Sequence, residues 1–135
     1  LQRVEIDPEK LEGFTPERQP DTATALNAGI AALLEKISRS KRPVLVLGGG
    51  LKTPYVGEAL LSTVERLGIP ALVTWAGLDL LPDAHPLRIG TFGVYGPRGG
   101  NFAVQNADLV IGIGTRLSQN LTGGMLSSFA REAEI

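Results

Sequence analysis

The stretch that decides the fold is Val44-Leu45-Val46-Leu47-Gly48-Gly49-Gly50. An apolar run this short, rich in β-branched residues, predicts a strand that is buried on both faces, as the strands of parallel sheets are. Glycines directly after such a strand indicate a turn in which the backbone comes close to another group. The stretch therefore predicts the first strand of a parallel sheet, with a close-approach turn at its carboxyl end.

The same strand pattern recurs twice further along the chain. A helical pattern begins at about Pro54 and is ended by Gly68. The run Ala71-Leu72-Val73-Thr74 then predicts a second buried strand. The two strands and the helix between them fit a right-handed βαβ unit. A third buried strand is expected at Leu109–Ile113, which runs into a Gly-x-Gly turn. We therefore expect an α/β fold with a doubly wound, Rossmann-like parallel sheet in three layers, in which these strands are neighbours.

The remaining segments predict further helices and one long loop. The expected helices are residues 21–40, capped by Asp21 or Thr22 and with an apolar stripe facing the core, and two shorter ones at 101–107 and 126–132. Residues 75–100 are rich in glycine and proline, and we interpret them as a functional loop because the segment is too long for an idle connection.

The domain organisation follows from the two ends of the chain. Residues 1–20 are polar and contain several prolines, which predicts an interdomain linker, so the domain proper spans 21–135. The first residue is Leu1, and the last residues alternate in polarity like the start of another strand. We therefore expect a fragment of a longer chain, with strands missing from its sheet.

Composition excludes several classes of function. The 135 residues are 43% apolar and 20% charged, which is typical of one globular domain. A net charge of −1 provides no field for nucleic acid or an anionic membrane, so we expect neither partner. With no cysteine and a single histidine, His85, the chain cannot hold a disulfide, a thiolate nucleophile or a zinc–cysteine site. No apolar run could cross a bilayer and the start is not a signal peptide, so the expected location is cytoplasmic.

The candidate binding site lies at the carboxyl ends of the strands, where backbone amides and helix N-termini attract phosphate. Residues 48–50 form either a tight turn or a phosphate cradle; Thr53 stands where a dinucleotide fingerprint needs its third glycine. Thr74 and Trp75 follow the second strand in place of an acidic residue, which disfavours an ordinary NAD dehydrogenase. We interpret Arg116, just past the third strand, as a pyrophosphate clamp in preference to a surface ion-pair partner.

Other candidate residues have a structural interpretation beside the functional one. Trp75 is more typical of a packing residue than of a stacking platform, and Tyr95 fits either a loop aromatic or a ligand wall. His85, between two prolines, fits a turn histidine bonded to its own loop better than a general base. Neither a catalytic set nor a metal cluster stands out, so we predict binding features without catalytic residues.

Six segments of the chain occur in a characteristic order and spacing. They are Gly48-Gly49-Gly50, Pro70-Ala71-Leu72-Val73-Thr74-Trp75-Ala76-Gly77, Leu81-Pro82-Asp83-Ala84-His85-Pro86-Leu87, residues 90–96, Asn101-Phe102-Ala103-Val104-Gln105-Asn106-Ala107-Asp108 and Gly112-Ile113-Gly114-Thr115-Arg116. From about Asp21 to the C-terminus, the chain resembles the central domain of thiamine-diphosphate-dependent enzymes, acetolactate synthase-like members most closely. The leading residues resemble the linker that follows the pyrimidine-binding domain.

The resemblance implies a three-domain parent enzyme, a transferase or lyase that is a homodimer or homotetramer. Its flanking pyrimidine- and diphosphate-binding domains hold thiamine diphosphate and magnesium, decarboxylate a 2-keto acid and transfer the carbanion to a carbonyl. The middle domain is a six-stranded, non-catalytic parallel sheet of the DHS-like NAD/FAD-binding type, which binds FAD, ADP or nothing. Carried over by position, the cofactor contacts are Gly48, Gly49, Gly50, Thr74, Trp75, Gly93, Val94, Tyr95, Gly114, Thr115 and Arg116.

Three positions depart from the pattern of the acetolactate synthase family. Tyr95 stands where a histidine is usual, Ser118 where an aspartate is and Asn120 where an arginine is, and each change removes a charged or polar FAD contact. Two alternatives remain open: a purely structural middle domain, and a free-standing nucleotide-binding module without thiamine-diphosphate chemistry. A sirtuin-like NAD domain is disfavoured because it needs zinc-binding cysteines.

Overall fold

The sheet of this protein has four parallel strands in the order β3-β2-β1-β4. The computed structural model describes residues 5–16, 23–53 and 56–135. The strands are β1 (Pro43–Leu47), β2 (Ala71–Val73), β3 (Arg88–Gly90) and β4 (Leu109–Ile113); the helices are α1 (Ala23–Arg39), α2 (Gly57–Leu67), α3 (Arg98–Gln105) and α4 (Gln119–Thr122). Leu45 pairs with Ala71 of β2 and Ile111 of β4, which confirms the predicted neighbours and their parallel direction.

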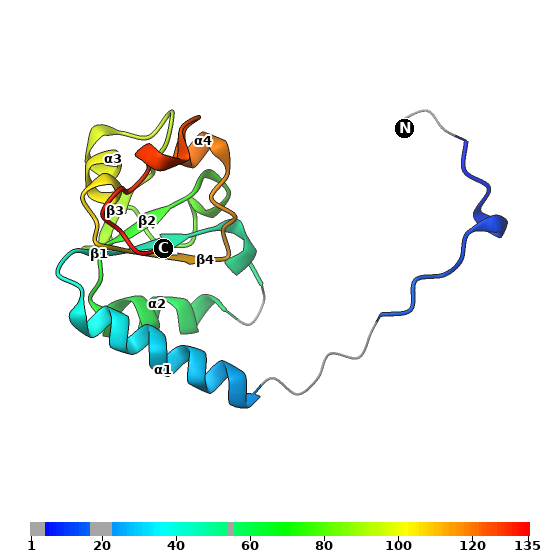
Figure 1. The fold of residues 1–135 in the computed structure, drawn as a ribbon, viewed down its shortest axis with the longest axis horizontal. Helices are drawn as coiled ribbons and strands as arrows, with labels where there is room; N and C mark the ends of the chain where they lie inside the picture. Colours follow the sequence, from blue (N-terminus) through cyan, green and yellow to red (C-terminus); the bar gives the residue numbers. More distant parts are fainter. Residues whose placement is uncertain (1–4, 17–22, 54–55) are drawn as a thin grey trace.

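Helices cover both faces of the sheet, so the predicted three layers are confirmed. Figure 1 shows α1 and α2 on one side and α3 and α4 on the other. Successive residues of β1 point to opposite faces. Leu45 and Leu47 belong to a core cluster with Leu60 and Val64 of α2. Val44 and Val46 belong to a second cluster, with Val104 of α3, on the opposite face. The two apolar clusters hold the strand ends in fixed positions.

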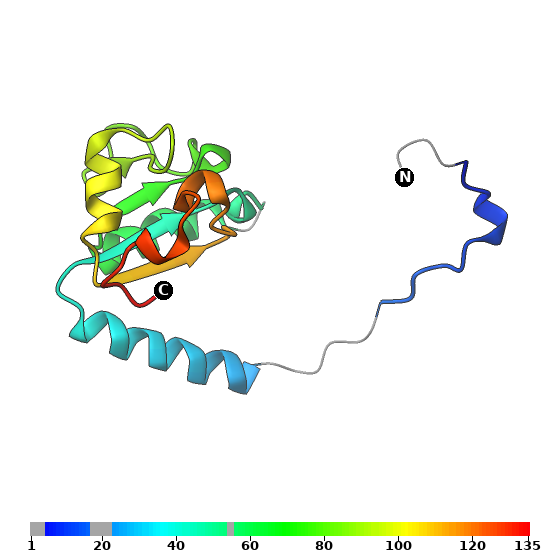
Figure 2. The same ribbon diagram turned by 45° about the horizontal axis from the view of Figure 1, so that its top comes forward.

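The end of α2 follows the prediction, but the packing of α1 does not. Gly68 adopts a left-handed conformation with φ 63° after the last residue of α2, as expected of a helix-terminating glycine. The proposed caps Asp21 and Thr22, and Pro54, lie outside the described residues. The apolar stripe of α1 was expected to face the core, yet α1 has no buried residue, and Ile37 is its only side chain packed against the core. Figure 2 shows α1 set away from the sheet.

Residues 75–100 are not a single loop, which corrects the prediction. They contain β3, and α3 begins at Arg98 rather than at Asn101. The strand was missed because it is short, only partly buried and ends at Gly90, whose φ of 117° is unlike that of an ordinary strand residue.

The helix predicted at 126–132 is also absent. A 3-10 turn at Leu126–Ser128 takes its place. Ala130 has a φ of 42°, and its amide donates to the Oε1 of Gln105, while Phe129 is buried with its ring 6.3 Å from that of Phe92. Burial of Phe129 in the core therefore outweighs the helical pattern of residues 126–132. A short helix that the sequence analysis did not predict, α4, lies just before this segment.

The last residues lie along the outer edge of β4. Leu109 forms a parallel bridge with Glu134, and the amide of Val110 donates to the Glu134 carbonyl at 2.8 Å. One isolated bridge thus falls in the segment whose alternating pattern resembles the start of another strand, and that strand itself stays a prediction. Among the described residues the sheet has four strands, against the six of the resemblance. No helix of the described residues is long and apolar enough to cross a membrane.

Candidate binding crevice

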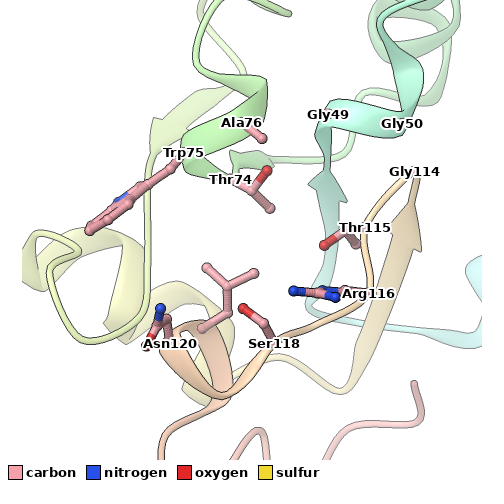
Figure 3. A pocket seen from close by; sticks show the side chains of 11 residues that line it. Gly49, Gly50, Thr74, Trp75, Ala76, Gly114, Thr115, Arg116, Ser118 and Asn120 are labelled. Carbon is pink, nitrogen blue, oxygen red and sulfur yellow. The ribbon is translucent and has the colours of Figure 1, made fainter. Parts of the chain in front are cut away.

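An open crevice of about 410 Å³ lies at the carboxyl ends of β1, β2 and β4. This is the edge where ligands bind in open parallel sheets. Figure 3 shows the side chains that line it. They are Gly49, Gly50, Thr74, Trp75, Ala76, Gly114, Thr115, Arg116, Ser118, Asn120 and Leu121. The volume is near the lower end of the range for small-molecule sites.

The glycine turns after β1 and β4 interlock at one side of this crevice. A Cβ on Gly48 would lie 2.2 Å from the carbonyl oxygen of Gly114, and one on Gly114 would lie 2.7 Å from the amide nitrogen of Leu51. Gly114 also has a φ of 62°, which favours glycine. Close approach of the two turns therefore requires glycine on both sides.

Two backbone amides of the turn after β1 are occupied. The amide of Gly48 donates to the carbonyl of Ile113 at 2.9 Å, and that of Gly50 to the carbonyl of Gly114 at 2.9 Å. Residues 48–50 are thus a tight turn that joins two strand ends, and two of the amides expected to cradle phosphate are committed elsewhere. An anion in this crevice would therefore depend on side chains in addition to the remaining amides.

Arg116 is the charged group of the crevice. No described carboxylate forms an ion pair with it, and none is among the residues that line the crevice. The nearby cation Lys52, by contrast, lies 2.5 Å from Asp79, and this hydrogen bond holds the pKa of the Asp79 carboxyl below its ordinary value. Hydroxyl groups of Thr74, Thr115 and Ser118 share the crevice with the guanidinium. The arrangement suits a compact anion.

Two aromatic rings meet at the other side of the crevice. Trp75 lines it and is 53% exposed, unlike the packing residue that its sequence context favours. Tyr95 is 72% exposed, and its ring centroid lies 5.1 Å from that of Trp75 with an interplanar angle of 37°. Tyr95 is therefore a partner of Trp75 on the adjacent loop.

Asn101 fixes the loop that carries Tyr95, a role that the sequence did not reveal. Its Oδ1 accepts from the amide of Gly93 at 2.7 Å, and its Nδ2 donates to the carbonyls of Gly93 and Gly96 at 3.0 and 3.1 Å. A Cβ on Gly93 would lie 2.4 Å from the carbonyl oxygen of Asn120. The only signal for this clamp was an amide residue directly after a glycine-rich segment.

The predicted contact residues divide into three groups. Gly49, Gly50, Thr74, Trp75, Gly114, Thr115 and Arg116 line the crevice. Gly48 is buried behind the turn, while Gly93, Val94 and Tyr95 lie on the neighbouring loop. Ser118 and Asn120, noted for departing from the family pattern, also line it, as do Ala76 and Leu121, which the sequence analysis missed.

His85 lies outside this set. Its Nδ1 accepts from the amide of Leu87 at 3.3 Å, which agrees with a turn histidine bonded to its own loop. Its buried Nε2 lies 3.8 Å from a carboxylate oxygen of Glu65 on α2. No group of three potential metal ligands occurs among the residues that the structure describes.

Comparison with known proteins places the chain in a family. The family described as thiamine pyrophosphate enzyme, central domain, matches residues 30–135. The chain is 34% identical to a "probable acetolactate synthase large subunit" of Methanococcus aeolicus, over 93% of this chain and 20% of that protein. It is 39% identical to the protein of the same name from Methanocaldococcus jannaschii, over 100% of this chain and 23% of the relative.

A relative with a different name matches a shorter part of the chain. It is 40% identical to a 3D-(3,5/4)-trihydroxycyclohexane-1,2-dione hydrolase of Clostridium perfringens, over 66% of this chain and 14% of that protein. The chain thus spans between 14% and 23% of the length of these relatives.

Proposed function

Because the chain belongs to the family of thiamine pyrophosphate enzyme central domains, we propose that it is the non-catalytic middle domain of an acetolactate synthase-like enzyme and that its crevice holds the diphosphate of FAD or ADP. Arg116 is the observation that carries the second part. An unpaired guanidinium beside hydroxyl groups can bind a diphosphate through two parallel hydrogen bonds.

In the whole protein, flanking domains of the same chain would bind thiamine diphosphate and magnesium, in a homodimer or homotetramer. When bound by those domains, thiamine diphosphate would supply the electron sink that allows a 2-keto acid to lose carbon dioxide and the remaining fragment to be joined to a second carbonyl. We assign the magnesium to the flanking domains because the family resemblance implies it there. This domain contributes packing surface and the nucleotide crevice.

The diphosphate proposal is tested by titrating the chain with inorganic pyrophosphate, ADP and FAD in a calorimeter. Arg116→Ala should weaken binding about ten- to a hundredfold, because a charge-assisted bidentate contact contributes roughly 1.5–3 kcal/mol. Arg131→Ala is the matched control, since it removes another exposed arginine that does not line the crevice. Equal effects of the two variants, or no binding by any probe, would contradict the proposal and favour the purely structural domain.

A further inference from the structure

We propose that Asn101 is a positioning residue of the crevice, which acts through the loop of residues 91–96 to hold α4 in place. Asn101 itself is not among the residues that line the crevice. Its effect on ligand affinity rests on the proposed function, whereas its effect on α4 can be measured without a ligand.

The segment that contains α4 forms one side of the crevice but has few ties to the rest of the chain. Ser118, Asn120 and Leu121 line the crevice, and Figure 3 shows the first two along one side of it. Among the described residues, one hydrogen bond joins residues 118–124 to another segment: the amide of Val94 donates to the carbonyl of Asn120 at 2.9 Å. The position of this side of the crevice therefore depends on the loop that carries Val94.

The backbone that leads into α4 is strained. Leu117, between Arg116 and the start of α4, has a φ of 45°, which is unfavourable for a side chain of this size. Its side chain packs against the core, as that of Leu121 does. Local preference thus does not set the position of α4, which depends on packing and on the contact with the loop.

Asn101 fixes the part of the loop that contacts α4. Its Oδ1 accepts from the amide of Gly93 at 2.7 Å, and its Nδ2 donates to the carbonyl of the same residue at 3.0 Å. A Cβ on Gly93 would lie 2.4 Å from the carbonyl oxygen of Asn120 and 2.9 Å from the Cα of Leu121. The residue that Asn101 holds from both sides is therefore packed directly against α4, and Val94 follows it.

The helix α3 provides a fixed base for Asn101. Val104 of this helix is fully buried, and a Cβ on Gly100 would lie 1.9 Å from the carbonyl oxygen of Thr91. The helix is thus packed closely on the start of the loop. The core holds α3, Asn101 of α3 holds the loop, and the loop holds α4.

Amide hydrogen exchange tests the effect on α4 without a ligand. Asn101→Ala removes the three hydrogen bonds of this side chain, and we expect the amides of Val94 and of residues 121–123 to exchange about tenfold faster or more. Asn101→Asp, which keeps one acceptor but has no donor for the two carbonyls, should act in the same direction. Asn106→Ala is the matched control, since its Nδ2 donates within α3, to the carbonyl of Phe102. Unchanged exchange of residues 121–123 in both Asn101 variants would overturn the positioning role.

Titration with inorganic pyrophosphate tests the effect on the ligand, under conditions in which urea denaturation shows each variant to be folded. Asn101→Ala should weaken binding about two- to thirtyfold, the range over which residues outside a site modulate it. It should also change the emission of Trp75, the only tryptophan, because its ring lies 5.1 Å from that of Tyr95 on the loop. Lower stability with unchanged affinity and emission would show a merely structural role and overturn the proposal.

A double variant shows whether Asn101 acts through the loop. Gly93→Ala disturbs the contact with α4 itself, so adding Asn101→Ala should weaken pyrophosphate binding by no more than about twofold further. Two effects that simply multiply would mean that Asn101 acts by another route, contrary to the proposal. If the parent chain binds no pyrophosphate, the proposed function is contradicted, and hydrogen exchange alone decides whether Asn101 positions α4.

Discussion

Gly48 lies where the turn after β1 meets the turn after β4. Gly48→Ala would bring a methyl group within 2.2 Å of the Gly114 carbonyl oxygen, and neither a Cβ nor a backbone carbonyl can rotate away, so one turn must move. We expect a loss of about 1–3 kcal/mol in the free energy of unfolding, measured by urea denaturation, as is typical of overpacking. Pyrophosphate binding should weaken as well, because the same turn positions the crevice.

Gly29→Ala is the matched control for this substitution. Gly29 lies within α1, and a Cβ there meets no atom within 4 Å. Alanine should therefore stabilise the chain by about 0.5–1 kcal/mol, through its higher helix propensity. If both variants were equally stable, the close approach of the two turns would not be a constraint on the sequence.

Asp108, at the opposite end of β4 from the crevice, predicts a pH dependence of stability. The hydrogen bond from the Ser40 hydroxyl is the main cause that lowers the pKa of Asp108 from 3.8 to about 2, and hydrogen bonds from the backbone amides of Lys41 and Arg42 add to it. A carboxyl with a lowered pKa in the folded state stabilises the fold above pH 4, and this contribution is lost as the pH falls from about 4 to 2. Asp108→Asn should unfold at a lower temperature at pH 7.

The same variant should show a weaker change of melting temperature between pH 4 and pH 2 than the parent chain. Asp79→Asn provides the comparison, because Asp79 makes a single exposed pair with Lys52 and should matter less. Identical pH profiles for the parent chain and Asp108→Asn would show that this carboxylate does not hold the segment between α1 and β1 to the start of β4.

Single residues of the site were predictable from sequence only where a regular element precedes them. Thr74 comes directly after β2 and Arg116 lies three residues after β4, so their place at the crevice follows from strand positions. Asn101 and Tyr95 could not be placed in this way, because their roles depend on how the loop after β3 folds back. The occupied amides of Gly48 and Gly50 depend on contact between distant turns, which no local pattern contains.

At the scale of elements, α1 is the least supported helix. Its apolar residues Leu26, Ile30, Leu33 and Leu34 are between 36% and 60% exposed, and only Ile37 contacts the core. A groove of about 360 Å³ between α1 and β4 lies beside them. Helical periodicity predicted the helix correctly, but it could not tell whether a partner for the apolar face lies within this chain.

This packing predicts an uneven response of α1 to truncation of its side chains. Ile37→Ala should reduce the free energy of unfolding by about 1–3 kcal/mol, because it removes the contact that holds α1 to the core. Ile30→Ala removes the same atoms from a side chain that is 46% exposed and should cost about 0.5 kcal/mol or less. Chemical denaturation measures both, and equal losses would contradict the exposed position of the stripe.

Strands and helices differ in how well local pattern predicted them. β1, β2 and β4 are short apolar runs, and their buried residues contribute to both core clusters, one on each face of the sheet. The segment after α4 failed as a helix because burial of Phe129 and the contact between Ala130 and Gln105 require another path. Tertiary contacts of this kind override local propensity.

For the whole molecule, the parallel sheet explains why fold and crevice arise together. Parallel strands end at one edge, so turns that are far apart in sequence converge there. The open outer edge of β4, where Glu134 bridges Leu109, and the exposed face of α1 lie beside the same groove. The crevice and that groove share no lining residue, so we expect binding in the crevice not to depend on what covers the edge of β4.

The last prediction separates binding from catalysis. We expect the 135-residue chain, supplied with thiamine diphosphate, magnesium and pyruvate, to release no carbon dioxide and form no acetolactate. Its crevice offers a guanidinium, hydroxyl groups and an amide, but no carboxylate among its lining residues to move a proton. A fixed cation and neutral donors can hold an anion, but they do not activate a carbon centre.

The measurement couples carbon dioxide release to a binding titration on the same preparation. The Methanocaldococcus jannaschii relative, assayed in parallel, serves as the positive control for the assay conditions. Binding of ADP without turnover by this chain would fit a domain that holds a nucleotide for chemistry performed elsewhere in a larger protein. Turnover that survives Arg116→Ala and Trp75→Leu would instead require a reactive centre away from the crevice, and it would contradict the assignment of this chain as non-catalytic.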